Sequence, residues 1–70
     1  MAEPPRTLGQ NIRARRKQLG WSQEQLAEKA DLHPVYIGSL ERGQENVSID
    51  SLARIAKSMK VAVSDFVSGL

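Results

Sequence analysis

The sequence predicts an all-α fold, a compact bundle of about five helices, from three observations. Apolar residues recur at helical spacing in several short runs. No run alternates between apolar and polar residues for long enough to favour a strand, and residues that cap or end helices separate the runs. With 70 residues and 40% hydrophobic content, the chain suits one domain with a small core.

The first helix is expected over residues 8–19. Thr7 and Gln10 have the spacing of a capping box, in which each side chain accepts a hydrogen bond from the backbone of the other residue. Gly20 follows as a residue that readily adopts the left-handed conformation at a helix end. These signals place the helix between Thr7 and Gly20.

The second helix is expected over residues 23–30, because Ser22 and Gln25 repeat the capping-box pattern. Asp31 tolerates the left-handed conformation at modest cost. His33 precedes a proline, which disfavours helical geometry at that residue. A turn of about three residues is therefore predicted after the second helix.

The third helix is expected over residues 34–42. Pro34 is favoured at the first helical position, and Gly43 closes the helix. The residues expected to face inward are Ile37, Leu40 and Glu41.

The fourth helix is expected over residues 49–59, after Ser48 as its cap. Ser64 caps a short fifth helix that contains Phe66 and Val67. The apolar face expected for the fourth helix consists of Ile49, Leu52, Ile55, Ala56 and Met59.

The composition argues against several classes of protein. The chain has no cysteine and one histidine, which excludes disulfides and argues against a zinc site. No apolar run approaches the ~18 residues of a membrane span, and there is neither a glycine-rich phosphate loop nor a catalytic acid pair. We expect no enzymatic activity, metal, cofactor or membrane partner. Residues 1–6 are expected to be a disordered lead without the apolar core of a signal peptide, residues 7–70 the domain, and the location cytoplasmic.

The formal net charge is only +2, but the basic residues are unevenly distributed. Five lie between residues 6 and 17 with no acidic residue among them: Arg6, Arg13, Arg15, Arg16 and Lys17. This distribution favours a polyanion on one side of the molecule. The alternative is a solvated helix face without a partner.

The second and third helices are too short to be stable alone, so each must be held by its neighbours. Counting Gln23 as the first position, the fifth, ninth, tenth, fifteenth and eighteenth are Ala27, Asp31, Leu32, Ile37 and Leu40. A small fifth residue allows a close helix crossing, the ninth makes the turn, and the three apolar positions bury the inner face of the pair.

Three stretches, IRARRKQLGWSQEQLAEKA, YIGSLERG and SIDSLARIAKSMKVAVSDF, carry a family resemblance. The chain resembles the Cro/phage-repressor type of helix-turn-helix regulator, also called the xenobiotic-response-element family. Through YIGSLERGQENVSI it is most similar to the small controller proteins of restriction-modification systems. The resemblance implies a lambda-repressor-like fold and a bacterial transcription regulator, a repressor being one form. It also implies that a homodimer binds a palindromic operator in double-stranded DNA.

The resemblance also implies which residues face base edges when the third helix enters the major groove. These are His33, Pro34, Val35 and Ser39. Val35 suits a thymine methyl group, and Ser39 suits a base or a phosphate. These residues offer few direct contacts to bases, so DNA shape is expected to contribute to specificity. Gly38 either lets the backbone approach DNA or allows close packing against another helix.

The residues expected to contact phosphates are Arg13, Gln23, Tyr36, Arg42, Gln44 and Asn46. Gln23 lies at a helix N-terminus, where free amides favour an anion; family members use this glutamine as a clamp, and simple solvation is the alternative. Tyr36 either binds a phosphate or packs against the fourth helix. Glu45 has the wrong sign for this loop.

The resemblance further implies a partly buried ion pair between Arg16 and Glu41, which joins the first helix to the third.

A homodimer interface is predicted at the C-terminus, where apolar residues exceed what one small core readily covers. Its residues are Val61, Val63, Phe66, Val67 and Leu70. The alternative is that all five complete the core of their own chain. A rival for the function is an antitoxin or interaction module of the same fold, which acts mainly through a protein partner.

Overall fold

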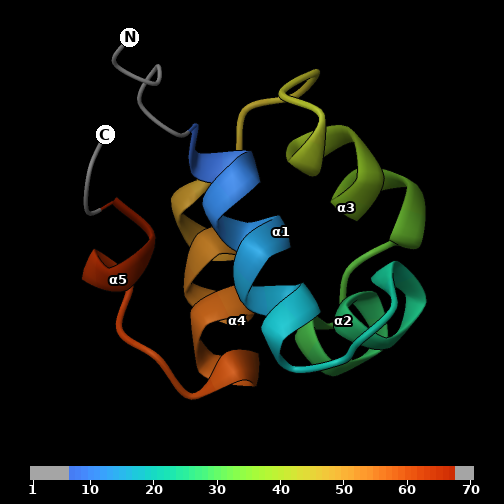
Figure 1. Cartoon of the computed structure of the whole chain (residues 1–70). Coiled ribbons are helices and arrows are strands. Elements are labelled where there is room, and N and C mark those ends of the chain that lie inside the picture. The colour runs from blue at the N-terminus through green and yellow to red at the C-terminus, as the bar shows by residue number, and fades with distance from the viewer. Residues whose placement is uncertain (1–6, 68–70) are drawn as a thin grey trace, which may run out of the picture.

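The computed structural model describes residues 7–67, in which five helices and no strand are present (Figure 1). They are α1 (Leu8–Gln18), α2 (Gln23–Ala30), α3 (Pro34–Glu41), α4 (Ile49–Met59) and α5 (Ser64–Val67). The all-α prediction is confirmed. α1 and α3 each end one residue earlier than expected, because Leu19 and Arg42 are their C-caps. The expected disordered lead, residues 1–6, lies outside the described residues.

The predicted capping boxes form at the N-termini of both α1 and α2. Gln10 N donates to Thr7 Oγ1 at 3.2 Å and Thr7 N to Gln10 Oε1 at 2.9 Å. The same reciprocal pair joins Ser22 and Gln25 at 3.1 and 2.7 Å. Gly20 adopts φ +74° just before the second box. Local sequence therefore determines where these two helices begin and how the corner between them turns.

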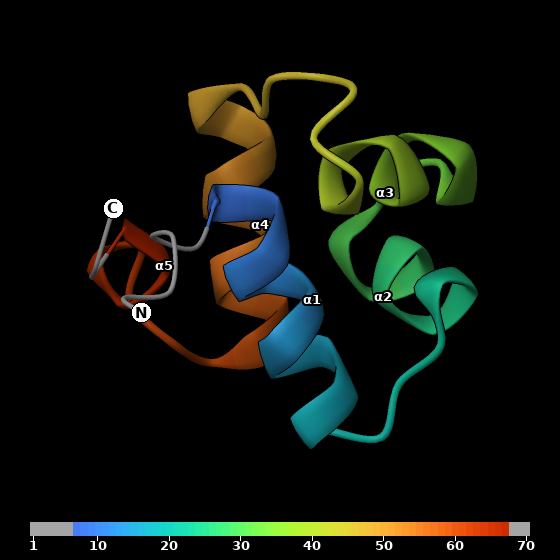
Figure 2. The same cartoon turned by 45° about the horizontal axis from the view of Figure 1, so that its top comes forward.

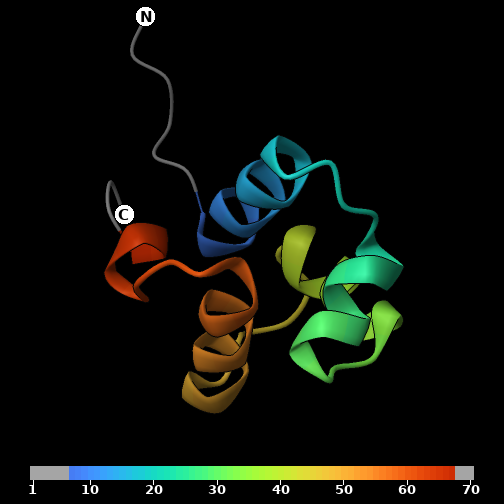
Figure 3. The same ribbon diagram turned by 90° about the horizontal axis from the view of Figure 1, so that it is seen from below.

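α2 and α3 pack against each other on one side of the molecule, where α2 also contacts α4 and α3 also contacts α1 (Figure 2). α5 lies beside α1 on the other side of the molecule, away from α2 and α3 (Figure 3). The fully buried side chains at the centre are Ile12, Leu26, Ile37 and Ile55. None of the helices within residues 7–67 has the length and hydrophobicity required to cross a membrane.

Gly9 makes a close approach between α1 and α3 possible. A Cβ atom placed on Gly9 would overlap the backbone carbonyl oxygen of Leu40 and lie 3.2 Å from the Cα atom of Glu41. Only a residue without a side chain fits between these two backbones. The contact holds the C-terminal half of α3 against α1.

Ile49 was expected on the apolar face of α4, and this prediction is wrong: the residue is 89% exposed. The buried arc of α4 is centred on Leu52 and Ile55 and extends toward Ser51, which is 7% exposed. Ile49 lies at the opposite edge of that arc, in the first turn, where no neighbouring helix covers it.

Candidate nucleic-acid interface

The turn between α2 and α3 is held by its own backbone. Asp31 is left-handed, with φ 56°, as its position predicts. Leu32 N donates to Ala27 O at 2.8 Å, which satisfies a carbonyl at the end of α2. Ala27, 1% exposed, leaves room for the close crossing of α3. The geometry therefore fixes the angle between the two helices.

α3 buries one side and leaves the other open. Ile37 and Leu40 are 0% and 2% exposed, whereas Val35 is 68% exposed. Pro34 and Ser39 are half-buried. Four expected base-contacting residues, His33, Pro34, Val35 and Ser39, therefore lie at or along the uncovered side of α3, which is at the edge of the molecule (Figure 2).

His33 is the N-cap of α3, a role that the sequence did not predict. Its Nδ1 atom accepts a hydrogen bond from Val35 N at 3.1 Å, which satisfies one of the free amides at the start of the helix. In the neutral ring, the proton is then on Nε2. His33 can therefore cap α3 and still offer one donor to a ligand.

Arg16 and Glu41 form the expected ion pair, with two parallel hydrogen bonds. Arg16 Nε donates to Glu41 Oε2 at 2.7 Å and Nη2 to Oε1 at 2.9 Å, while Nη1 donates to Trp21 O at 2.7 Å. Both residues are buried. The hydrogen bonds to Glu41 raise the pKa of Arg16 although burial acts in the opposite direction. Arg16 thus joins α1, the α1–α2 corner and α3.

Gln23 is attached to the same pair. Its Nε2 atom donates to Glu41 Oε1 at 3.1 Å, so the side chain is held in place and not simply solvated. One amide hydrogen of Nε2 is used in this bond, and the second remains for a ligand.

Arg42 and Gln44 lie together at the end of α3. Arg42 Nε donates to Gln44 Oε1 at 3.1 Å, and both residues are exposed. Asn46 and Glu45 are also exposed. Tyr36 is half-buried and packs against the core, and its hydroxyl accepts from Ser48 N at 3.5 Å, at the start of α4. Packing at α4 is therefore the contact that Tyr36 makes in this structure.

Three of the six expected phosphate-contacting residues line one recess. The recess is bordered by Arg13, Arg16, Gln23, Glu41 and Arg42. Three arginines and one glutamate leave it an excess of two positive charges. Arg16 is engaged by Glu41, and within residues 7–67 Arg13 and Arg42 have no carboxylate partner. The recess, defined by these five residues, is called the arginine recess below.

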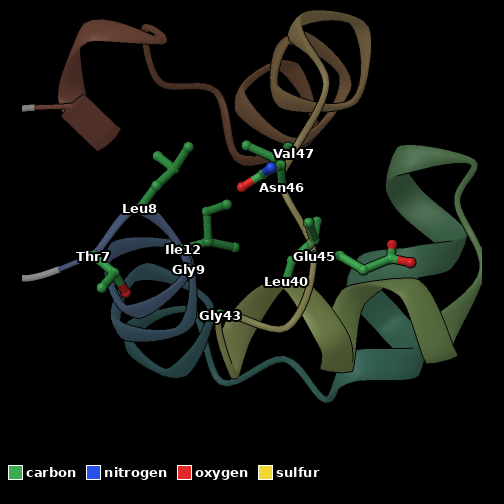
Figure 4. A pocket seen from close by; sticks show the side chains of 9 residues that line it. All are labelled: Thr7, Leu8, Gly9, Ile12, Leu40, Gly43, Glu45, Asn46 and Val47. Atoms are coloured by element: carbon green, nitrogen blue, oxygen red, sulfur yellow. The ribbon is translucent and has the colours of Figure 1, made fainter.

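A second hollow lies between the start of α1 and the loop after α3 (Figure 4). Leu8, Ile12, Leu40 and Val47 form its apolar walls, and Asn46 and Glu45 come from the loop. Glu45 is the only ionisable residue in its lining. No basic residue is among the described residues that line this hollow, unlike the arginine recess.

Arg54 connects α4 to the turn, and the sequence interpretation missed it. Arg54 Nη1 donates to Asp31 O at 3.2 Å, and Arg54 Nε lies 3.0 Å from Asp50 Oδ2. The spacing of Asp50 and Arg54, four residues apart, was the available signal. The bond to Asp31 could not be read from local spacing because the two residues are 23 positions apart.

The expected dimer residues differ in how far they are exposed. Phe66 is 2% exposed in the core of its own chain, and its carbonyl accepts from Asn11 Nδ2 at 2.7 Å. For Phe66, the alternative that it completes its own core is therefore the one observed. Val63 and Val67 are 39% and 44% exposed, and Val61 is half-buried. Leu70 lies outside the described residues.

The model of a helix-turn-helix family matches residues 12–66. The chain belongs to this helix-turn-helix family. It is 45% identical over 56 residues to the control protein C.SmaI of Serratia marcescens, covering 80% of this chain and 67% of that protein. It is 42% identical over 61 residues to the control protein C.BamHI of Bacillus amyloliquefaciens, covering 86% and 75%.

Solved structures of helix-turn-helix regulators match the fold. The restriction-modification controller protein C.AhdI of Aeromonas hydrophila superposes with a TM-score of 0.83 at 36% identity, covering 84% of this chain and 89% of that one. SinR, a master regulator for biofilm formation whose structure was solved in complex with DNA, superposes with a TM-score of 0.84 at 35% identity, covering 89% and 100%.

Proposed function

We propose that the protein is a transcriptional regulator that binds a palindromic operator in double-stranded DNA as a homodimer, with α3 in the major groove. One observation carries the proposal: α3 buries Ile37 and Leu40 while Val35 stays 68% exposed, next to a recess with excess positive charge. An exposed helix face flanked by basic groups suits the major groove, which admits a helix and offers a distinct pattern for each base pair.

Base reading is assigned to the start of α3 and to Ser39 further along the helix. The exposed methyl groups of Val35 suit the methyl group of thymine, and His33 Nε2 and Ser39 supply donors. Pro34 has no side-chain donor. Because so few polar groups face the bases, sequence-dependent DNA shape contributes part of the specificity.

Backbone contacts are assigned to the arginine recess and the loop after α3. Arg13, Gln23 and Arg42 converge at the recess, and Gln44 and Asn46 extend the contacts along the flanking strand. Tyr36 is assigned a phosphate contact at the edge of the groove. Its hydroxyl accepts a hydrogen bond from Ser48 N at the start of α4. Phosphate contacts set the register of the protein on DNA and give binding its salt dependence.

The dimer is assigned to the α5 side of the molecule, opposite α2 and α3 (Figure 3). Val63 and Val67 offer exposed apolar surface there. Two copies related by twofold symmetry would place two α3 helices on half-sites about one helical turn apart, roughly 34 Å. The likeness to C.SmaI, C.BamHI and C.AhdI supports a role in controlling the genes of a restriction-modification system.

The test begins with selection of bound fragments from random duplex DNA, followed by affinity measurements at two salt concentrations. We expect an inverted-repeat sequence, two chains per duplex and a steep loss of affinity with salt. Val67→Asp should reduce the dimer population in sedimentation and weaken operator binding. Failure to bind any duplex would contradict the proposal and favour the protein-partner alternative.

A further inference from the structure

Gly38 lies in the middle of α3, where glycine costs about 1 kcal/mol relative to alanine. Close packing of two helices does not account for it. The nearest atoms that a Cβ atom on Gly38 would meet are side-chain atoms: Arg42 Nη1 at 3.1 Å, Gln23 Oε1 at 3.4 Å and Arg42 Cζ at 3.8 Å. At Gly9, by contrast, the obstacle is the backbone of α3. The space over Gly38 is therefore filled by two polar groups.

These two groups come from different helices and are held independently. The carboxamide of Gln23, at the start of α2, is anchored by Glu41, which is anchored by Arg16. The guanidinium group of Arg42, at the end of α3, lies back over the preceding turn of its own helix, with Nε bonded to Gln44. Gly38 is the place where both meet.

We propose that Gly38 is a positioning residue for DNA binding: its missing side chain lets the Arg42 guanidinium lie beside the Gln23 amide, so that both donate to one phosphate of the operator backbone. This inference rests on the proposed function. Arginine Nη atoms suit two phosphate oxygens at once, and Gln23 Nε2 has a second hydrogen available. Arg13, on the same recess, adds positive charge.

The tests are Gly38→Ala, Arg42→Ala and the double variant, measured on a duplex selected by the wild-type protein. Gly38→Ala should unfold at the same or a higher urea concentration, because alanine favours a helix and the atoms displaced are ends of side chains. Its operator affinity should nevertheless fall about tenfold for each bound chain, and so roughly a hundredfold for the dimer, because each chain loses one charged hydrogen bond. The salt slope should fall by about one for each bound chain.

The double variant tests whether the added methyl group weakens binding by displacing Arg42 or by some other route. If Gly38 acts through Arg42, adding Gly38→Ala to Arg42→Ala should change affinity by less than about twofold. A loss that persists in the Arg42→Ala background would overturn the inference, since the methyl group would then act other than through Arg42. Wild-type affinity of Gly38→Ala would overturn it as well.

Two further arms complete the test. Lys57→Ala is the control for loss of a positive charge. Lys57 is exposed on α4 and lines a hollow other than the arginine recess. Its substitution should leave operator affinity within about twofold of wild type. Duplexes with one neutral methylphosphonate linkage should identify a phosphate whose neutralisation costs the wild type clearly more affinity than it costs Arg42→Ala, which keeps only the Gln23 contact. No such linkage would refute a shared phosphate, and no wild-type binding to any duplex would overturn the proposed function itself.

Discussion

Replacing Glu41 by alanine should destabilise the fold more than any surface substitution. Glu41 is 6% exposed and accepts three hydrogen bonds, two from Arg16 and one from Gln23. Arg16 is 8% exposed, so the substitution leaves a buried guanidinium without its partner. Breaking a buried pair in this way costs about 3–5 kcal/mol.

That loss is large for a domain of this size. At roughly 0.05–0.15 kcal/mol per residue, a chain of 70 residues has an unfolding free energy of roughly 4–10 kcal/mol. Glu41→Ala should therefore remove a large fraction of the stability. At about 4–8 °C per kcal/mol, we expect the melting temperature to fall by more than about 12 °C.

The assay is urea and thermal unfolding followed by far-ultraviolet circular dichroism. Glu45→Ala is the control, because Glu45 is exposed and has no ion pair among the described residues. Equal midpoints for the two variants would refute the structural role of the pair. The pKa of Arg16 is raised, so its contribution is present below the ordinary arginine pKa and is lost only as the pH rises through the raised value.

The remaining predictions concern the cap, the helix crossing and base reading. His33→Ala should lower the unfolding free energy by about 1 kcal/mol, because Val35 N loses its acceptor. His33→Asn should retain most of the wild-type stability. Equal stability of His33→Ala and the wild type would count against the cap. Gly9→Ala should cost about 1–3 kcal/mol in urea unfolding, because the methyl group meets the Leu40 carbonyl, and wild-type stability would argue against a fixed crossing. Replacing thymine by uracil at the base that Val35 contacts should weaken binding roughly fourfold, the worth of one buried methyl group; the same loss in Val35→Ala would exclude that contact.

Local chemistry explains what could be predicted from the sequence. The capping boxes, the left-handed Asp31 and the closure at Gly43 each depend on residues within one turn of each other. Sequence spacing is sufficient for such features. The ion pair between Arg16 and Glu41, 25 residues apart, was available only because the chain resembles a known family.

What was missed depends on packing between distant segments. Arg54 reaches Asp31 only after α4 has docked on α2. The helical spacing of apolar residues placed Ile49 on the apolar face of α4, but this spacing gives no information on where the helices that cover α4 end. The hydrogen bond between Gln23 and Glu41 and the space over Gly38 also require α2 and α3 to be placed first. These features arise from tertiary contacts that no local pattern encodes.

The 2.7 Å hydrogen bond from Asn11 to the Phe66 carbonyl ties α5 to α1, and α1 is tied in turn to α3 through Arg16. If α5 joins two copies, the path from one recognition helix to the other runs through packed helices and contains no flexible linker. Each inserted base pair shifts a half-site by about 3.4 Å and rotates it by about 34°. A rigid dimer could not follow that rotation, so spacer length would act as a strict selector of operators, independently of the bases in each half-site.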